Sequence, residues 1–189
     1  MNPQPLICVR DVEASSRWSQ RLLGCQSGHG GPHYERLVSQ DGLILQLHRW
    51  DVEHHHGPIG DPNLPPGNGV LLWFEVDDFD AAVARASELR AEIVLGRHRN
   101  PPDRDGGPNH WEIWLRDPDG YIVEAIQVPA PADAPAGNVL GSIMGLTVRD
   151  MDESLRFWQE QLGWTFTGDK AFVKMPAMLD LMGLPAGSE

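Results

Sequence analysis

The segment "VRDVEASSRW" at residues 9–18 introduces a pattern that the chain uses three times. Related versions stand at residues 76–85, "VDDFDAAVAR", and at residues 148–157, "VRDMDESLRF". In each copy an apolar run ends in an acidic residue, and a segment rich in Ala, Ser, Leu and Arg follows. An acidic side chain just before a helix accepts hydrogen bonds from the free N–H groups and complements the helix dipole. The copies therefore predict three strand-to-helix junctions.

The residues after the first two helices predict antiparallel strands. "HYERLVSQDGLILQLHRW" at residues 33–50 carries "DG" between two apolar runs, and "HWEIWLRDPDGYIVEAIQV" at residues 110–128 carries "DPDG" in the same role. Both are hairpin signals. Each unit, at about residues 5–50 and 70–128, is therefore expected to contain a strand, a helix and further antiparallel strands, which makes the fold class α+β.

The third copy is incomplete, and this shapes the expected domain organisation. We expect residues 1–128 to form one domain, residues 129–138 a Pro/Ala linker, and residues 139–189 an incomplete second domain with one partial unit. The stretches 51–69 and 96–110 are expected to be long loops. A lone unit leaves apolar surface in water, so we expect either a piece of a longer tandem protein or a homodimer formed through the third unit.

Composition narrows the classes of partner. The chain has 15 Lys and Arg against 27 Asp and Glu, a net charge of -12, which repels phosphate backbones and anionic membrane surfaces. No apolar run approaches the roughly 18 residues of a membrane-spanning helix. The chain starts without a basic signal-peptide region, and it has only two cysteines. We therefore expect a cytoplasmic protein that binds a small molecule rather than nucleic acid or a membrane.

Period-two alternation assigns side chains to the two faces of each strand. In "LILQLHRW" at residues 43–50, the leucines share one face, and Gln46, His48 and Trp50 share the other. The same alternation gives the following members of a mixed polar and aromatic face on later strands: Trp73, Glu112, Trp114 and Glu124. Such a face suits a small-molecule cavity better than a dry core.

We expect the members of this face to divide into two roles. Trp50, Trp73 and Trp114 would stack on a ligand, although filling the core is an equal alternative for each indole. The polar members would orient ligand groups, with Glu124 and His48 as candidates for acid–base catalysis. The alternative for both is a buried, hydrogen-bonded side chain without a catalytic role.

Two stretches resemble the vicinal oxygen chelate superfamily, which contains glyoxalase I, bleomycin-resistance proteins and extradiol dioxygenases. They are "IWLRDPDGYIVEAIQ" at residues 113–127 and "GVLLWFEVDDFDAAVARASELRAEIV" at residues 69–94. The resemblance covers residues 5–128 as a pair of units and residues 140–175 as the start of another. It implies paired βαβββ units that form an open, cup-shaped sheet, with the helices outside and the ligand inside.

The resemblance also implies where a metal would bind. Metal-dependent members take ligands from the first and last strands of each unit, and these positions correspond here to Gln4, Gln46, Leu71 and Glu124. Leucine cannot ligate, and two amides with one carboxylate bind divalent ions weakly. The sequence therefore predicts a metal-poor cup without a cofactor.

These observations leave three functions open, and they leave open whether the chain is an enzyme. The first is a glyoxalase or bleomycin-resistance-like protein that binds a small, planar or hydrophobic molecule. The second is a metal-dependent lyase or dioxygenase that holds a divalent metal on His48, His110 and Glu124. The third is a non-enzymatic interaction module. Fold class alone does not choose among them.

Overall fold

A computed structural model describes residues 4–40, 42–50, 61, 63–100, 110–127, 139–146 and 148–163. Several segments discussed above lie outside these described residues. They are residues 51–60 and 101–109 of the two expected loops, the expected linker at 129–138, and residues 164–189 of the expected third unit.

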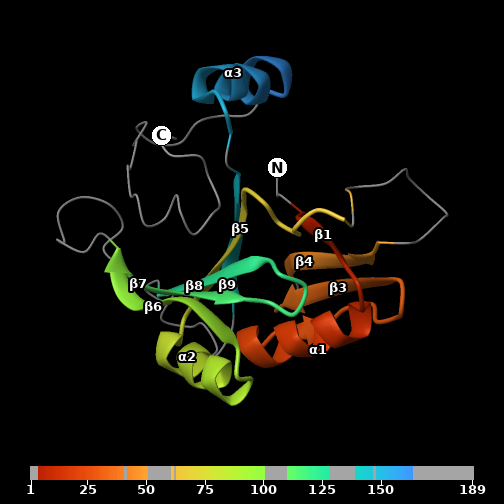
Figure 1. Cartoon of the computed structure of the whole chain (residues 1–189), viewed down its shortest axis with the longest axis vertical. Helices are drawn as coiled ribbons and strands as arrows, with labels where there is room; N and C mark the ends of the chain where they lie inside the picture. The colour runs from red at the N-terminus through yellow and green to blue at the C-terminus, as the bar shows by residue number, and fades with distance from the viewer. Residues whose placement is uncertain are drawn as a thin grey trace.

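The first unit forms a four-stranded sheet, called sheet A, with one helix (Figure 1). Its strands follow the order β1-β4-β3-β2, with β1 parallel to β4 and the other neighbours antiparallel. The elements are β1 (Leu6–Val9), α1 (Val12–Leu23), β2 (Gln26–Ser27), β3 (Tyr34–Ser39) and β4 (Gly42–Arg49). This sequence of elements is the expected βαβββ unit.

The second unit repeats this arrangement in a second sheet, called sheet B. Its strands follow the order β6-β7-β8-β5, and β5 is parallel to β8 as β1 is to β4. The elements are β5 (Val70–Val76), α2 (Phe79–Glu88), β6 (Glu92–Asn100), β7 (His110–Arg116) and β8 (Ile122–Gln127). The α+β class with paired βαβββ units is confirmed. The loop expected at residues 96–110 was wrong in part, because β6 continues to Asn100.

The three predicted helix starts are confirmed. The side chains of Asp11, Asp78 and Asp150 each accept a hydrogen bond from the backbone N–H three residues later, at 2.9, 2.9 and 2.8 Å. The third helix, α3 (Met151–Arg156), continues as the π-helical turn η1 (Phe157–Gln161). In the part of the chain that the structure describes, no helix is long and apolar enough to cross a membrane.

One apolar core joins both units. It contains the helix-facing residues of both sheets, such as Leu47 in β4 and Phe74 in β5, together with Leu22 of α1 and Ala82 of α2. The two helices lie side by side in Figure 1, and the Arg85 guanidinium of α2 donates a 2.7 Å hydrogen bond to the carbonyl oxygen of Leu22. The face of sheet B that points away from this core is called the cup face below.

The turn between β7 and β8 fastens the second unit to the first. Asp119 in this turn accepts hydrogen bonds from the Ser15 hydroxyl of α1, at 2.5 Å, and from the backbone N–H of Arg10, at 2.8 Å. The Tyr121 hydroxyl donates to the carbonyl oxygen of Cys8 in β1. The two units are therefore held together through the ends of strands and the start of a helix.

The third unit contributes β9 (Val139–Leu146) to sheet B, where it pairs antiparallel with β5. Among the described residues no ladder joins sheets A and B, and β9 occupies the edge of β5. Pairing satisfies backbone N–H and C=O groups that an open strand edge would leave without partners. The domain boundaries and the homodimer through the third unit stay predictions.

Candidate functional site

Two buried glutamates face each other on the cup face of sheet B. Glu112 of β7 is 0% exposed and Glu124 of β8 is 2% exposed. Burial, the hydrogen bond with Glu112 and the charge of Glu112 together raise the pKa of Glu124 to about 10, whereas the hydrogen bond with the Trp114 indole lowers it. The raised pKa favours the neutral form of the Glu124 carboxyl beside Glu112.

Two histidines lie close to the Glu112 carboxylate, one at each of its two oxygens. His98 of β6 places Nε2 2.7 Å from Oε1, and His110 of β7 places Nε2 2.9 Å from Oε2. The His110 ring packs edge-on against Trp73, with 6.0 Å between ring centroids. His98, His110, Glu112 and Glu124 are called the carboxylate cluster below.

Part of this cluster could hold a metal ion. One donor atom each from His110, Glu112 and Glu124 can be chosen so that all three lie within 4.8 Å of one another. Of the alternative metal set of the sequence analysis, His110 and Glu124 belong to this donor group together with Glu112, whereas His48 lies on β4 of sheet A; the alternative set stays a prediction. Of the four positions implied by the resemblance, Leu71 of β5 offers no ligand atom, and Gln46 lies on β4 of sheet A.

Gln46 and His48 form a separate group in sheet A. The Gln46 amide accepts a hydrogen bond from the Tyr34 hydroxyl and donates at 3.1 Å to the carbonyl oxygen of Gln4. His48 is buried; its Nδ1 lies 2.8 Å from the carbonyl oxygen of Arg49, and its ring packs edge-on against Tyr34. None of these contacts involves Glu124, so the described contacts do not bring the three predicted residues into one group.

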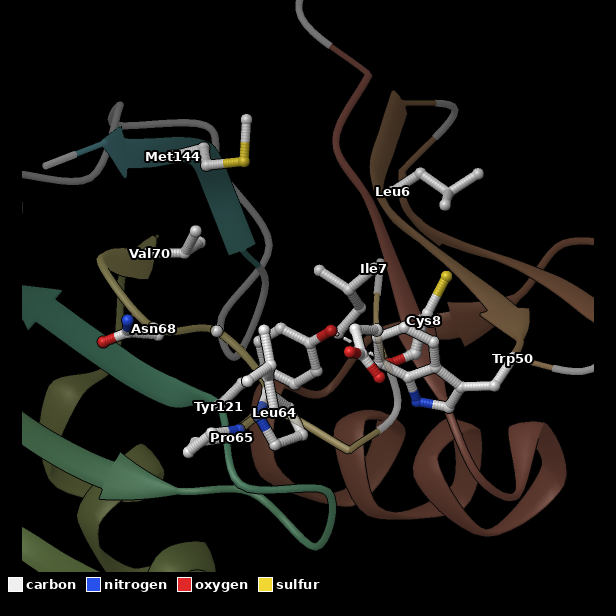
Figure 2. Close-up of a pocket in the computed structure, with 13 residues that line it drawn as sticks. Leu6, Ile7, Cys8, Trp50, Leu64, Pro65, Asn68, Val70, Tyr121 and Met144 are labelled. Atoms are coloured by element: carbon white, nitrogen blue, oxygen red, sulfur yellow. Dashed lines mark hydrogen bonds between the residues drawn. The ribbon is translucent and has the colours of Figure 1, made fainter. Parts of the chain in front are cut away.

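A pocket of about 410 Å³ lies between the first strands of the units, and it is called the seam pocket below (Figure 2). Trp50, which follows β4, extends its indole into this pocket, and Met144 of β9 lies across from β1. The other lining residues are Leu6, Ile7, Cys8, Asp61, Leu64, Pro65, Pro66, Gly67, Asn68, Val70 and Tyr121. The three tryptophans expected on one wall are therefore divided, with Trp50 in the seam pocket and Trp73 and Trp114 in sheet B.

The polar groups of the seam pocket are few. Burial raises the pKa of the Cys8 thiol, so this cysteine stays protonated and unreactive. Burial also raises the pKa of Tyr121, whose hydroxyl is engaged with Cys8. Asp61 and Asn68 are exposed members of the lining. The lining is therefore mainly apolar, and its charged and amide groups are exposed to water.

Sequence reasoning missed two residues that matter for these sites. His98 lies in the stretch 96–110, where clustered Gly, Pro and Asp residues indicated a loop, and bulges in β6 disturb the alternation that would have placed its side chain. Tyr121 directly follows the predicted "DPDG" turn, but nothing local indicates that its hydroxyl reaches β1 of the other unit.

Residues 3–125 match the family pattern of the Glyoxalase/Bleomycin resistance protein/Dioxygenase superfamily. The chain belongs to this superfamily. The matched range contains the whole first βαβββ unit and the second unit as far as Ala125 in β8. A search of curated protein sequences found no match to this superfamily member.

Solved structures share the fold at low sequence identity. An integron cassette protein from V. Cholerae is 19% identical, with a TM-score of 0.51 over 67% of this chain and 94% of its own. Virulence protein STM3117 from Salmonella typhimurium is 21% identical, with a TM-score of 0.50 over 67% and 94%. TioX from Micromonospora sp. ML1 is 16% identical, with a TM-score of 0.51 over 67% and 98%. These likenesses support the superfamily fold alone.

Proposed function

We propose that this superfamily member binds a small, planar or hydrophobic molecule in the seam pocket. The observation that carries the proposal is the pocket itself, which has a volume of about 410 Å³ and a mainly apolar lining. Binding sites for small molecules typically have volumes of about 300–1,000 Å³, apolar walls and a few polar groups that fix orientation.

The lining residues favour a particular kind of ligand. The Trp50 indole offers a flat surface on which a planar ring system can stack. Val70 and Met144 provide aliphatic walls from β5 and β9. The Asp61 carboxylate in the lining, in a chain with a net charge of -12, disfavours anions. The preferred ligand is therefore neutral or cationic, with a planar or hydrophobic body.

The cysteines agree with a cytoplasmic setting for this function. Cys8 and Cys25 are both free and buried, and no disulfide between them contributes to the fold. Proteins with buried free thiols are typical of reducing compartments.

A metal-dependent lyase or dioxygenase activity is a second candidate function. The observation that favours it is the carboxylate cluster, because two carboxylates and an imidazole suit a divalent ion far better than the amides and leucine at the positions the resemblance implies. The two candidates use different sites, so they can be tested separately.

Titration with the neutral fluorescent probe N-phenyl-1-naphthylamine tests the proposed pocket. Met144→Ala and Leu146→Ala form a matched pair, because both residues lie on β9 and are similarly exposed, at 41% and 44%, but only Met144 lines the pocket. We expect Met144→Ala and Trp50→Ala to weaken probe binding by at least about fivefold, and Leu146→Ala to leave it unchanged.

Two outcomes would count against the proposal. One is a wild-type chain that does not bind the probe. The other is equal weakening by Met144→Ala and Leu146→Ala, which would mean that the probe binds the exposed surface of β9 and not the seam pocket.

A further inference from the structure

We propose that a ligand in the seam pocket holds β9 of the third unit on the edge of β5, so that ligand binding and the pairing of these two strands strengthen each other. This inference rests on the proposed function, because it takes the seam pocket as the binding site. It goes further by giving the third unit a part in that site. The evidence is the position of β9, the side chain of β9 that reaches the pocket, and the exposure of that side chain.

β9 forms part of the wall of the seam pocket. It pairs antiparallel with β5 along residues 139–146, and it also comes close to β4 of sheet A. Met144 of β9 and Val70 of β5 line the pocket from one side, and Leu6 of β1 lines it from the other (Figure 2). The wall on the side of β5 is therefore complete only while β9 stays paired.

Met144 occupies a position that is buried in the second unit. Leu72 of β5 and Met144 of β9 each stand six residues before the acidic cap of the next helix, and they are register partners in the ladder. Leu72 is 2% exposed in the shared core, whereas Met144 is 41% exposed. β9 therefore brings a core-type side chain to the pocket, where the described residues leave much of it uncovered.

A ligand would supply the packing that Met144 lacks. Burial of apolar surface is favourable in proportion to the area removed from water, and the flexible thioether side chain adapts to the shape of its neighbour. This gain exists only while β9 is paired, because detachment of β9 carries Met144 away from the pocket. The ligand therefore shifts β9 toward pairing by a factor equal to the ratio of its affinities for the paired and detached states.

The two ends of β9 are anchored unequally. Val139 at one end is 4% exposed and packs in the shared core, whereas Met144 and Leu146 at the other end are exposed. Local opening of a strand requires less free energy where fewer apolar side chains are buried. The end of β9 that borders the pocket is therefore the end that a ligand can stabilise most.

Hydrogen exchange of the full chain, followed by mass spectrometry, measures the opening of β9 with and without N-phenyl-1-naphthylamine. At a saturating concentration of this probe, we expect exchange of the backbone amides at residues 139–146 to slow by at least about fivefold. This factor is the affinity ratio expected for loss of the Met144 contact. Exchange in β2 and β3, which do not line the pocket, should change by less than about twofold.

Three single changes on β9, each measured at its own saturating probe concentration, test the cause of the slowing. Met144→Ala removes the pocket contact, so the slowing should fall below about twofold. Leu146→Ala changes a side chain of similar exposure that does not line the pocket, and it should keep the full slowing. Val139→Ala loosens the buried end of β9, so exchange without the probe should be at least about threefold faster, and the slowing by the probe should remain.

The outcomes distinguish this inference from the proposed function. Probe binding that depends on Met144 but leaves exchange at residues 139–146 unchanged would overturn the coupling and leave the pocket proposal standing. Equal slowing in the wild-type chain and in Met144→Ala would also overturn the coupling, because the slowing would then not come from the pocket contact. A wild-type chain that does not bind the probe would overturn both proposals.

Discussion

The Tyr121 hydroxyl donates a 2.9 Å hydrogen bond to the carbonyl oxygen of Cys8, although 113 residues separate the two. The bond joins the start of β8 in the second unit to β1 in the first. It lies in the same junction as the contacts of Asp119 with Ser15 and Arg10. The relative placement of the two units therefore depends on a few buried polar contacts as well as on the shared apolar core.

Removal of this hydroxyl should destabilise the chain. We expect Tyr121→Phe to lower the free energy of unfolding by about 1–2 kcal/mol, because a buried carbonyl oxygen loses its partner. The other tyrosine of the chain, Tyr34, is only half buried, so Tyr34→Phe is a matched control with a smaller expected effect. Urea denaturation measures both variants. If both variants lost the same free energy of unfolding, the hydrogen bond between Tyr121 and Cys8 would contribute no more to stability than a half-buried hydroxyl does.

Gly67 should not tolerate a side chain. A Cβ at this position would lie 2.5 Å from the Tyr121 ring, and the backbone has a φ of +68°, which favours glycine. Gly163 has nearly the same φ, +69°, but open space around it. We expect Gly163→Ala to cost about 1 kcal/mol for the backbone alone, and Gly67→Ala to cost about 1–3 kcal/mol more because of the clash. Thermal unfolding measures the stability of the two variants. Equal losses of stability in Gly67→Ala and Gly163→Ala would refute this prediction.

Asp117 should make stability depend on pH. Burial, together with the charge of Asp119, raises its pKa from 3.8 to about 6, although the hydrogen bonds from the backbone N–H groups of Tyr121, Gly120 and Asp119 act to lower it. Because folding raises this pKa, the folded state favours the protonated form of Asp117. The contribution of Asp117 to stability is therefore fully present below about pH 3.8 and is lost as pH rises through about 6. Asp117→Asn retains an oxygen acceptor without a charge.

We therefore expect wild type and Asp117→Asn to have similar unfolding free energies near pH 4, and the variant to be more stable by about 1–3 kcal/mol at pH 7. Chemical denaturation across this pH range measures the difference. Glu88→Gln, at an exposed carboxyl on α2, should show no such trend. A constant difference between Asp117→Asn and wild type at all pH values would contradict the prediction.

Removal of β9 should make the chain self-associate. A chain that ends at residue 128 keeps both complete units but leaves the edge of β5 open, and unpaired strand edges pair with other chains. A chain that ends at residue 146 keeps β9 and should associate less. Light scattering after size-exclusion chromatography compares their masses. The protein concentration in this comparison is about 100 µM, which is well above the dissociation constant of a specific interface. A chain ending at residue 128 that stays monomeric at this concentration would contradict the expectation.

Local signals predicted the individual units well. The three acidic caps and the turn at residues 117–120 depend on contacts within a few residues. Alternation correctly placed Trp73 on the face of β5 opposite the core residues Leu72, Phe74 and Val76. Local signals do not determine which strand pairs with the edge of β5, because any strand of suitable length can form hydrogen bonds with its backbone groups. The sequence of the strand therefore did not reveal that β9 would pair with it.

The candidate sites were predicted in part for the same reason. Alternation placed Glu112, Trp114 and Glu124 on one face, and the structure brings them together. It also assigned Gln46 and His48 to an equivalent face of another strand. Alternation identifies the face of a strand but not which sheet faces meet, so the separation of these two groups could not be inferred.

The pairing of β9 with β5 has a consequence for how such a protein evolves after duplication of a unit. Because β9 is attached to the same polypeptide by residues 128–138, its effective concentration at the β5 edge is on the order of millimolar, as for other short tethers. A free second chain at about 1 µM would compete at a disadvantage of about a thousandfold. A tethered third unit thus pairs with the β5 edge inside the same chain, so this edge is no longer open to a second chain, although no residue of β5 has changed.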